Sequence, residues 1–315
     1  MKLSVGVLTY NHSKFICQCL DSILMQDSDF DFVIVVADDG SNDGTQAILR
    51  SYAEKNPGRF VLLLKEKNEG ISKNYKDLLM SCEGQYIALC EGDDYWTAED
   101  KLQKQVDFLE SHREYGFVGA YSQLLYPNGE IKEDKYDYMT KPSIENGWEL
   151  YGDVFEYAKL GPVTRTVSLC FRRSIIVPYV QYEGLGNDLV LQTVLAKHSW
   201  FAKYEQPMTI YRQGGVSTSR NDFEKRLYYN DWYVNNRLLQ KKLFPYDCNW
   251  DEDELMDSGD YIRLQQAISN CDWKMSLELK RGLRTDVYKK KKFSKYLRGP
   301  LSCIFLWISK KFFVS

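Results

Sequence analysis

Residues 3–41 read LSVGVLTYNHSKFICQCLDSILMQDSDFDFVIVVADDGS. This stretch contains two short apolar runs, at 3–9 and 32–37, and β-branched residues are common in both. Between them, residues 13–26 carry apolar side chains at helical spacing. A strand, a helix and a second strand in this arrangement form a βαβ unit whose two strands run parallel. The stretch therefore predicts the beginning of an α/β fold.

The same alternation continues through the first third of the chain. Residues 60–65 and 85–90 have the composition of buried strands, and residues 43–55 and 71–82 have the pattern of helices. Stacked units of this kind give a mainly parallel, Rossmann-like sheet flanked by helices. Farther along, the pattern predicts a helix at 99–112, a strand at 116–126, a helix near 147–159, a strand at 167–172, a helix at 186–197 and short strands near 201–211.

Composition and charge exclude several classes of protein. Apolar residues make up 44% of the 315 residues and charged residues 27%, which is typical of a folded globular chain. The net charge of −3 combines an acidic body with a basic tail, since eleven Lys and Arg but one acid follow Leu279. Nucleic-acid-binding domains usually carry their positive charge on the folded body, so we expect no nucleic-acid partner.

The cysteines and the N-terminal residues bear on the compartment. The eight cysteines include no CxxC pair and have no regular spacing, which favours a reducing compartment over a disulfide scaffold. The first residues, MKLSVGVLTYNHS, contain too short an apolar run for a signal peptide. We therefore expect a cytoplasmic protein.

Polar segments follow three of the predicted strands at their carboxyl ends. They are Thr9-Tyr10-Asn11, Asp38-Asp39-Gly40-Ser41 and Glu91-Gly92-Asp93-Asp94. In open α/β sheets, ligands bind beyond the carboxyl ends of the strands, where loops and helix N-termini converge. The sequence therefore predicts a ligand site at this edge.

The acidic run at 91–94 fits a divalent cation. Mg²⁺ and Mn²⁺ prefer a few carboxylate oxygens plus water, and such a cation stabilises a departing diphosphate as a Lewis acid. The alternative is a solvated turn in which an Asp stabilises the start of a helix. Asp38 and Asp39 end an adjacent strand in the same way, which favours the functional interpretation.

Four motifs resemble those of a known family. VLTYNHSKFICQCLDSIL, DDGSNDGT, NEGISKNY and EGDDYWTAEDKLQKQ closely resemble the family 2 glycosyltransferases over about residues 1–215. The resemblance implies a GT-A fold and an inverting, hexosyltransferase-type enzyme. Its donor would be a nucleotide-diphosphate sugar, a UDP-sugar in the first instance, and its acceptor a hydroxyl of a glycan or lipid-linked molecule. It also implies a role in assembling bacterial-type surface polysaccharide.

The resemblance assigns roles to individual residues. Thr9 and Asp39 would contact the nucleotide base, and the 91–94 run would be the family's DxD-type motif, which holds ribose and metal. We expect Asp93 and Asp94 to bind Mn²⁺ or Mg²⁺, with Glu91 nearer the ribose. The complete set of expected donor-binding residues is Thr9, Tyr10, Asn11, Asp39, Lys73, Asn74, Glu91, Asp93 and Arg212.

Arg212 follows Tyr211 in a pair that resembles the family's late Tyr-Arg motif. The planar fork of an arginine pairs well with phosphate oxygens, so Arg212 is expected to reach the diphosphate. The histidine that often follows in the family is missing from YRQGGVSTS, so a third metal ligand is not expected there. The alternative role is a surface ion-pair partner.

Asp188, in GLGNDLVLQ, matches the position of the family's catalytic base. An in-line displacement needs a carboxylate on the face opposite the leaving group, so this base should come from a separate element from the metal cluster. The alternative is an Asp that only interacts with the dipole of its helix. Trp96, beside the acidic run, is expected to line the acceptor site, because aromatic rings stack on sugar faces.

After residue 220 the pattern is helical, and we place a boundary at 215–220. Residues 1–217 are then the GT-A domain, and residues 218–284 a C-terminal helical extension, either an acceptor platform or an oligomer interface. Residues 285–315 form a basic, apolar tail whose apolar run is shorter than the roughly 20 residues of a membrane span. This tail fits either an anchor on the anionic inner face of the cell membrane or a helix packed on the body.

Sequence signatures of several other enzymes are absent. The chain lacks GxGxxG, GxxxxGK[ST] and GxSxG, which disfavours a dinucleotide oxidoreductase, a P-loop enzyme and an α/β-hydrolase. The competing hypothesis is a non-catalytic carbohydrate-binding or membrane-scaffold protein that has kept the fold. The intact carboxylates favour the enzyme.

Overall fold

The structure is a computed structural model that describes residues 1–134, 139, 142–181, 187–214, 222–248, 250–253, 255–256, 258 and 263. The chain divides into two compact units, Met1–Thr218 and Ser219–Ser315. Among the described residues, all strands belong to the first unit.

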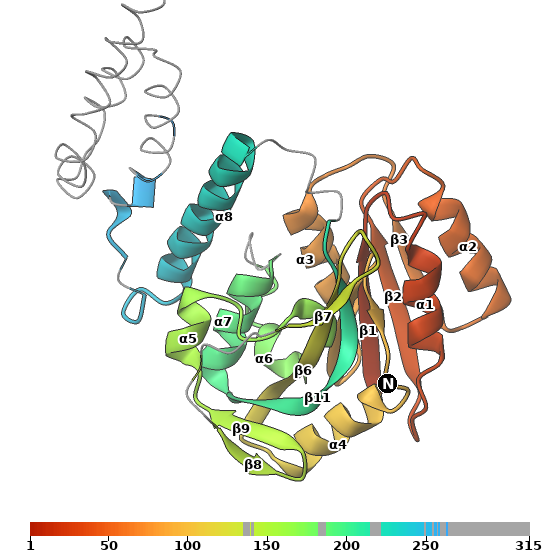
Figure 1. The fold of residues 1–315 in the computed structure, drawn as a ribbon, viewed down its shortest axis with the longest axis horizontal. Coiled ribbons are helices and arrows are strands. Elements are labelled where there is room, and N and C mark those ends of the chain that lie inside the picture. The colour runs from red at the N-terminus through yellow and green to blue at the C-terminus, as the bar shows by residue number, and fades with distance from the viewer. Residues whose placement is uncertain are drawn as a thin grey trace, which may run out of the picture. The chain divides into compact units, whose positions relative to one another are not determined.

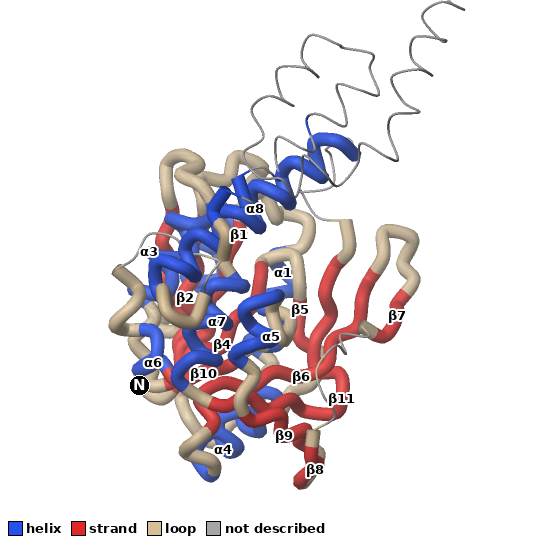
Figure 2. Tube along the Cα trace, turned by 90° about the vertical axis from the view of Figure 1, so that its left-hand side faces the viewer, coloured by secondary structure: helices blue, strands red, loops and turns tan. Residues whose placement is uncertain are grey.

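One mixed sheet forms the frame of the first unit (Figure 1). Its strands lie in the order β3-β2-β1-β4-β10-β6-β11-β9-β8, while β5 pairs with β11 and β7 pairs with β6. Figure 2 shows how β6, β11, β9 and β8 continue the sheet beyond β10. The strands are β1 (Leu3–Thr9), β2 (Phe32–Asp38), β3 (Phe60–Leu64), β4 (Tyr86–Glu91), β5 (Tyr95–Trp96), β6 (Tyr115–Leu125), β7 (Ile131–Glu133), β8 (Ser143–Glu145), β9 (Trp148–Gly152), β10 (Cys170–Arg172) and β11 (Trp200–Arg212).

The strand directions bring several loops to one side. Strands β3, β2, β1 and β4 pair in parallel. Because β10 is antiparallel to both β4 and β6, β6 has the direction of β4, and β11 pairs in parallel with β6. The carboxyl ends of β1, β2, β4, β6 and β11 therefore lie at the same edge of the sheet, which we call the carboxyl edge. The predicted α/β class, a GT-A type Rossmann-like sheet flanked by helices, is confirmed.

Helices cover both faces of the parallel strands. Figure 1 shows α1 and α2 on one side of β1 to β3 and α3 on the other. Strands β1 and β2 are buried along their whole length, which explains why they read as continuous apolar runs. The helices of this unit are α1 (Ile16–Leu24), α2 (Thr45–Lys55), α3 (Ile71–Ser81), α4 (Lys101–Ser111), α5 (Phe155–Leu160), α6 (Arg173–Ile176), α7 (Asp188–His198) and the short 3-10 helix η1 (Thr166–Ser168).

The main hydrophobic core lies between the sheet and helices α1, α2 and α4. Val5 and Val7 of β1 belong to it, together with Leu20 of α1, Leu49 of α2 and Leu102 of α4. Fully burying one such side chain stabilises the fold by about 2 kcal/mol. This packing fixes the strand ends, and therefore the loops of the carboxyl edge.

The structure corrects three predicted elements, and one of them is the strand predicted at 167–172, which is the 3-10 helix η1 followed by the three-residue strand β10. The helix predicted near 147–159 is strand β9 followed by the shorter helix α5. Asn146 and Gly147 both have positive φ, +50° and +82°, which is the two-residue turn that closes a β-hairpin between β8 and β9. The short strands expected near 201–211 are one 13-residue strand, β11, whose register shifts around Pro207, a residue that cannot donate to the ladder.

The second unit begins with α8 (Asp222–Leu243). Most of the predicted helical extension beyond this helix, and the whole predicted tail at 285–315, lie outside the described residues. Within the described part of the chain, no helix combines the length and the apolarity that crossing a membrane requires.

Candidate functional site

Three hydrogen bonds tie the loops of the carboxyl edge together. The N–H of Gly92 donates to the carbonyl of Leu8 over 2.7 Å, which joins the end of β4 to the end of β1. The N–H of Asp39 donates to the carbonyl of Thr9 over 3.1 Å, which adds the end of β2. From β11, the N–H of Arg212 donates to Asp94 Oδ1 over 2.7 Å. The predicted polar segments are therefore neighbours in space.

Gly92 is where these loops approach most closely. A Cβ atom at this position would lie 2.9 Å from both Thr9 Oγ1 and His12 Nδ1. Any other residue would require the Thr9 and His12 side chains, or the loops that carry them, to shift. The glycine within the acidic run therefore permits the close approach of the two loops.

The loops after β1 and β2 are locked by side chains from the DDGSNDGT segment. The N–H of Asn11 donates to Ser41 Oγ over 2.8 Å, and the N–H of Asn42 donates to Asn11 Oδ1 over 3.0 Å. Asn11 has a φ of +55°, a left-handed conformation that Asn tolerates well. Its side chain is thus engaged in holding the turn, whereas Tyr10 beside it is half-buried.

Asp39 holds the loop that precedes α3. Its carboxylate accepts hydrogen bonds from the N–H groups of Glu69, over 3.0 Å, and Gly70, over 2.9 Å. Lys65 Nζ lies 3.5 Å from Asp39 Oδ1 and 3.1 Å from Asp77 Oδ2. Asp39 therefore fixes the loop before α3 and lies beside the half-buried Lys65, and its predicted contact with a nucleotide base stays a prediction.

The two predicted donor contacts on α3 differ in exposure. Lys73 is exposed and forms an ion pair with Glu69 over 2.5 Å. Asn74 is buried, and its Nδ2 donates to the carbonyl of Ala37 over 2.9 Å, which fastens α3 to β2. The Asn74 amide nitrogen is thus engaged within the fold, while its Oδ1 has no hydrogen-bond partner among the described residues, and the predicted donor contact stays a prediction.

The acidic run contains carboxylates in unlike surroundings. Burial raises the pKa of Glu91 to about 8, and the charges of Asp93 and Asp188 add to this rise. Burial also raises the pKa of Asp94 well above its usual range, as do the charges of Glu91 and Asp93. Asp93 is more accessible, and its Oδ2 lies 3.8 Å from His12 Nε2. Several carboxylates are thus held close together in a poorly solvated place.

Buried polar atoms without partners gather at this same edge. Most buried polar groups in folded proteins have a hydrogen-bond partner. Among the described residues of the first unit, the buried side-chain polar atoms that lack a hydrogen bond belong to Thr9, His12, Asn74, Tyr75, Glu91, Asp94 and Arg212, and to Lys65, whose ammonium is nevertheless ion-paired with Asp77. All of them lie on the loops or the helix start at the carboxyl edge, as expected for a site that receives a polar ligand.

The residues present fit a divalent cation bound mainly by phosphate and water. Asp94 Oδ2 is buried without a hydrogen-bond partner, and the neighbouring carboxylates raise the pKa of Asp94, so a cation would relieve their repulsion. Among the described residues, no group of three or more His, Cys, Asp or Glu side chains forms a complete ligand set. Mg²⁺ and Mn²⁺ often use one or two protein carboxylates beside substrate phosphates, which matches this arrangement.

Asp188 reaches the same site from a distant part of the chain. It begins α7, but the helix is capped by Asn187, whose Oδ1 accepts a hydrogen bond from the N–H of Val190 over 2.9 Å. Burial raises the pKa of Asp188, and its charge in turn raises the pKa of Glu91. Since Asn187 fills the capping position, Asp188 is available for another role.

The structure contradicts the prediction that Trp96 lines an acceptor site. Only 1% of Trp96 is exposed, and its Nε1 donates to the carbonyl of Val167 over 2.8 Å. Lys101 Nζ lies 4.0 Å from the centre of its ring, so the indole packs inside the core. Strand β5, which the sequence pattern did not predict, pairs with β11 and turns this side chain inward.

Arg212 lies at the mouth of the acidic cluster. Its guanidinium carbon is 4.9 Å from the ring centre of Phe15 and 5.2 Å from that of Tyr95, and one of its nitrogens donates to Gln18. These contacts hold the guanidinium against Phe15 and Tyr95, while the backbone N–H of the same residue is bonded to Asp94. This position is compatible with the predicted contact to a diphosphate.

Sequence reasoning missed an arginine that also belongs to this site. Arg165 forms a 2.6 Å ion pair with Asp134, and its guanidinium carbon lies 4.8 Å from the ring centre of Tyr211. Its charge lowers the pKa of Asp188, which burial otherwise raises. The segment TRTVS that contains Arg165 has no motif character, so only the folded chain reveals this position.

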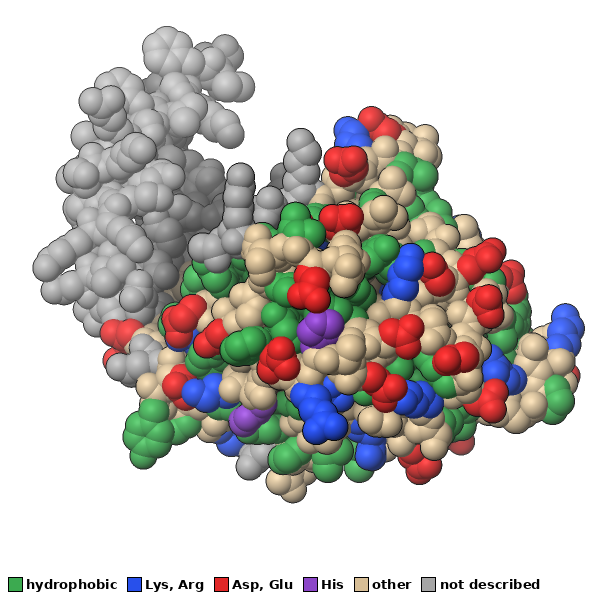
Figure 3. Space-filling view, turned by 90° about the horizontal axis from the view of Figure 1, so that it is seen from below, with side chains coloured by type: hydrophobic (Ala, Val, Ile, Leu, Met, Phe, Trp, Pro, Cys, Tyr) green, Lys and Arg blue, Asp and Glu red, His purple; other side chains and the backbone are tan. Residues whose placement is uncertain are grey.

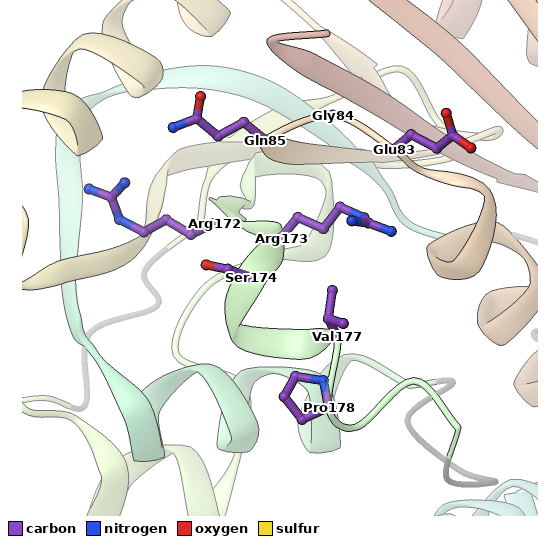
Figure 4. A pocket seen from close by; sticks show the side chains of 8 residues that line it. All are labelled: Glu83, Gly84, Gln85, Arg172, Arg173, Ser174, Val177 and Pro178. Atoms are coloured by element: carbon purple, nitrogen blue, oxygen red, sulfur yellow. The ribbon is translucent and has the colours of Figure 1, made fainter.

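A separate cavity lies at the other end of β4. It has a volume of about 380 Å³ and is lined by Glu83, Gly84, Gln85, Arg172, Arg173, Ser174, Val177 and Pro178. Figure 4 shows the side chains of Arg172 and Arg173 pointing away from each other. Arg172 is engaged by the carbonyl of Tyr115 and the hydroxyl of Tyr86. The cavity is therefore distinct from the carboxylate cluster.

In the view from below the fold, Figure 3 shows acidic and basic side chains interspersed.

Comparison with known sequences identifies one family. The model of the family described as "Glycosyl transferase family 2" matches residues 4–176, more than half of the chain. The Bacillus subtilis protein named "Putative glycosyltransferase EpsE" is 36% identical over 119 residues, which cover 38% of this chain and 42% of that protein. The chain thus spans less than half the length of this curated relative.

Two solved structures resemble the fold. One is S. aureus TarS 1-349 in complex with UDP-GlcNAc, with a TM-score of 0.53 and 18% identity, covering 91% of this chain and 77% of that one. The other is the mannosyltransferase PcManGT from Pyrobaculum calidifontis in complex with GDP-Man and Mn²⁺, with a TM-score of 0.52 and 16% identity, covering 100% and 88%. At these identities the likeness concerns the fold.

Proposed function

Because this chain belongs to glycosyl transferase family 2, we propose that it transfers a sugar from a nucleotide-diphosphate sugar to a hydroxyl group of a glycan or lipid-linked acceptor. The transfer inverts the anomeric carbon and serves the assembly of a surface polysaccharide. A UDP-sugar is the first donor to consider, because TarS was solved with UDP-GlcNAc. GDP-mannose is the second, because PcManGT was solved with GDP-Man.

The observation that carries this proposal is the gathering of unpartnered buried polar atoms at the carboxyl edge. Glu91 Oε2, Asp94 Oδ2 and Arg212 Nε are all buried without a hydrogen-bond partner among the described residues. Leaving such groups unsatisfied costs roughly 1–3 kcal/mol each. A ligand with phosphates, ribose and an associated cation offers both the donors and the acceptors that these groups lack.

The donor half of the reaction uses residues of β4 and β11. Asp93 and Asp94 would hold Mn²⁺ or Mg²⁺, which when bound supplies Lewis-acid stabilisation of the departing diphosphate. Arg212, whose guanidinium lies against Phe15 and Tyr95, pairs with phosphate oxygens. Thr9 and Asp39 contact the nucleotide, and the loop at Glu69 and Gly70 stays fixed on Asp39 by its two hydrogen bonds.

The acceptor half depends on Asp188. Its carboxylate accepts the proton of the attacking hydroxyl as that oxygen bonds to the anomeric carbon and the bond to the diphosphate breaks. Burial strengthens Asp188 as a base by raising its pKa, and the Arg165 charge opposes an excessive rise. Asp188 thus lies close enough to the donor carboxylates to influence Glu91, yet it comes from a different element.

The proposal is tested with the purified full chain and a panel of nucleotide sugars. Release of nucleoside diphosphate is measured with Mn²⁺, with Mg²⁺ and with EDTA, and nucleotide binding is measured separately by calorimetry. We expect turnover with one donor class and its loss in EDTA. Absence of both turnover and nucleotide binding across the panel would support the non-catalytic hypothesis instead.

A further inference from the structure

Tyr75 carries a buried hydroxyl group that the fold does not use. It lies on α3, and only 3% of the residue is exposed. Its hydroxyl has no hydrogen-bond partner among the described residues. Buried tyrosine hydroxyls usually find a partner, and an unpaired one lowers stability. Phenylalanine would fill the same space without this penalty, so stability does not explain the hydroxyl.

The hydroxyl is linked electrostatically to both halves of the proposed reaction centre. The charges of Glu91, at the end of β4, and Asp188, at the start of α7, both act on it. Helix α3 is fixed in place because Asn74, the preceding residue, donates to the carbonyl of Ala37 in β2 over 2.9 Å. Tyr75 therefore lies on a helix that is fixed to β2, and the charges of two carboxylates from different elements act on its hydroxyl.

This position has a chemical meaning that rests on the proposed function. In an in-line displacement, the transferred sugar lies between the leaving diphosphate and the base that activates the acceptor. Glu91 belongs to the donor side, where it is expected near the ribose, and Asp188 is the base. A group close to both lies beside the sugar. We propose that the Tyr75 hydroxyl is part of the subsite for the transferred sugar and donates a hydrogen bond to one of its oxygens.

Tyr75→Phe removes the hydroxyl alone and tests this assignment. Calorimetry with UDP, and with the UDP-sugar that the wild type turns over, separates the nucleotide from the sugar. We expect an unchanged Kd for UDP and a roughly 10-fold loss of kcat/KM for the UDP-sugar, as for one lost hydrogen bond in a closed site. If GDP-mannose is the working donor, GDP and GDP-mannose replace these two ligands.

Tyr86→Phe is the matched control. Tyr86 is fully buried at the opposite end of β4, and its hydroxyl accepts a hydrogen bond from Arg172 Nη1 over 3.1 Å. Removing this bonded hydroxyl should lower the melting temperature by about 3 °C and leave kcat/KM unchanged. Tyr75→Phe should show the reverse, with an unchanged or higher melting temperature and a lower kcat/KM.

Three results would overturn the assignment: wild-type kcat/KM in Tyr75→Phe, an equal loss of affinity for UDP and for the UDP-sugar, or a fall in melting temperature like that of Tyr86→Phe. The last two would make Tyr75 a nucleotide contact or a structural residue. Failure of the proposed function looks different, because the wild-type protein itself would then neither bind UDP or GDP nor turn over any donor.

Discussion

The two halves of the sheet build their parts of the site in different ways. Around β1, β2 and β4, the site residues lie in short contiguous motifs, and backbone hydrogen bonds hold these loops to one another, as between Gly92 and Leu8. Around β6 and β11, single side chains come from well-separated segments, such as Arg165, Asp188 and Arg212. The first half is a pre-formed cradle, whereas the second is an assembly of individual groups.

This difference suggests a division of labour. A cradle of parallel strand ends suits a ligand part with fixed geometry, such as a nucleotide diphosphate. Individual side chains on separate elements can change with less effect on the fold, which suits the acceptor side. The two halves meet where Asp188 and Glu91 influence each other. Changes on the two sides should therefore affect catalysis and donor binding separately.

The largest effect is expected at Asp188. Asp188→Asn removes the proposed base while keeping the size of the side chain, so kcat should fall by roughly 1,000-fold. The Kd for the nucleoside diphosphate should stay at its wild-type value, because the donor cradle is intact. Steady-state kinetics and calorimetry measure the two quantities. The control is Asn187→Ala, which removes the helix cap and should lower stability by about 1 kcal/mol but keep most of kcat.

A change in the cradle should affect both quantities together. Asp94→Asn removes a proposed metal ligand, so Mn²⁺-dependent donor affinity and turnover should both fall by roughly 100-fold. The exposed Asp100, which pairs with Lys104, provides a control, since Asp100→Asn should change neither. Donor affinity that survives in Asp94→Asn while turnover is lost would remove the proposed distinction between the two halves.

Lys101 is the first residue of α4, the helix that follows β4 and β5 and precedes β6. It is fully buried over Trp96, and burial lowers its pKa to about 8 from 10.5. The unfolded chain therefore binds more protons between these pH values, so stability should rise as pH increases from 8 to 10.5, by a few kcal/mol. Denaturant unfolding across this window measures the rise. It should be absent in Lys101→Met, and an equal rise in the variant would show that other groups cause it.

The smallest of these effects is expected at Gly92. In Gly92→Ala the added Cβ lies 2.9 Å from Thr9 Oγ1 and His12 Nδ1, so the loops must shift apart. We expect a loss of about 2 kcal/mol in the free energy of unfolding, together with weaker nucleotide binding. Gly44→Ala is the control for a loop glycine with open space around its Cβ, although its positive φ of +100° carries a cost of its own. Gly92→Ala should weaken nucleotide binding more than the control does.

The sequence predicted the parallel half of the fold closely. The strands expected at 3–9, 32–37, 60–65 and 85–90 are β1 to β4 with small shifts at their ends. Strands buried on both faces read as unbroken apolar runs, and the helices between them have one apolar side. The local pattern of apolar residues is therefore enough to predict these elements. The hairpin of β8 and β9 escaped this pattern, because pairing with β11 outweighs helical spacing in residues 148–152.

The residues of the candidate site also divide into those that local motifs predicted and those that only the folded chain placed. Contiguous motifs pointed to Asp39, Asp93 and Asp94, because the end of a buried strand fixes where its next residues lie. The burial of Trp96 could not be inferred in this way. Asp94 lies two residues earlier and belongs to the candidate site, whereas the indole of Trp96 packs into the core. The predicted roles of these carboxylates remain proposals.

The sequence alone determined the class of fold, the family and the edge of the sheet at which we propose that a ligand binds, because these depend on local periodicity and on contiguous motifs. Only the tertiary structure brought the Asp188 charge to bear on Glu91, placed Arg165 against Tyr211 and left the Tyr75 hydroxyl without a hydrogen-bond partner among the described residues. These relations join residues that are far apart in the chain. Their strength depends on burial and distance, which no local pattern encodes.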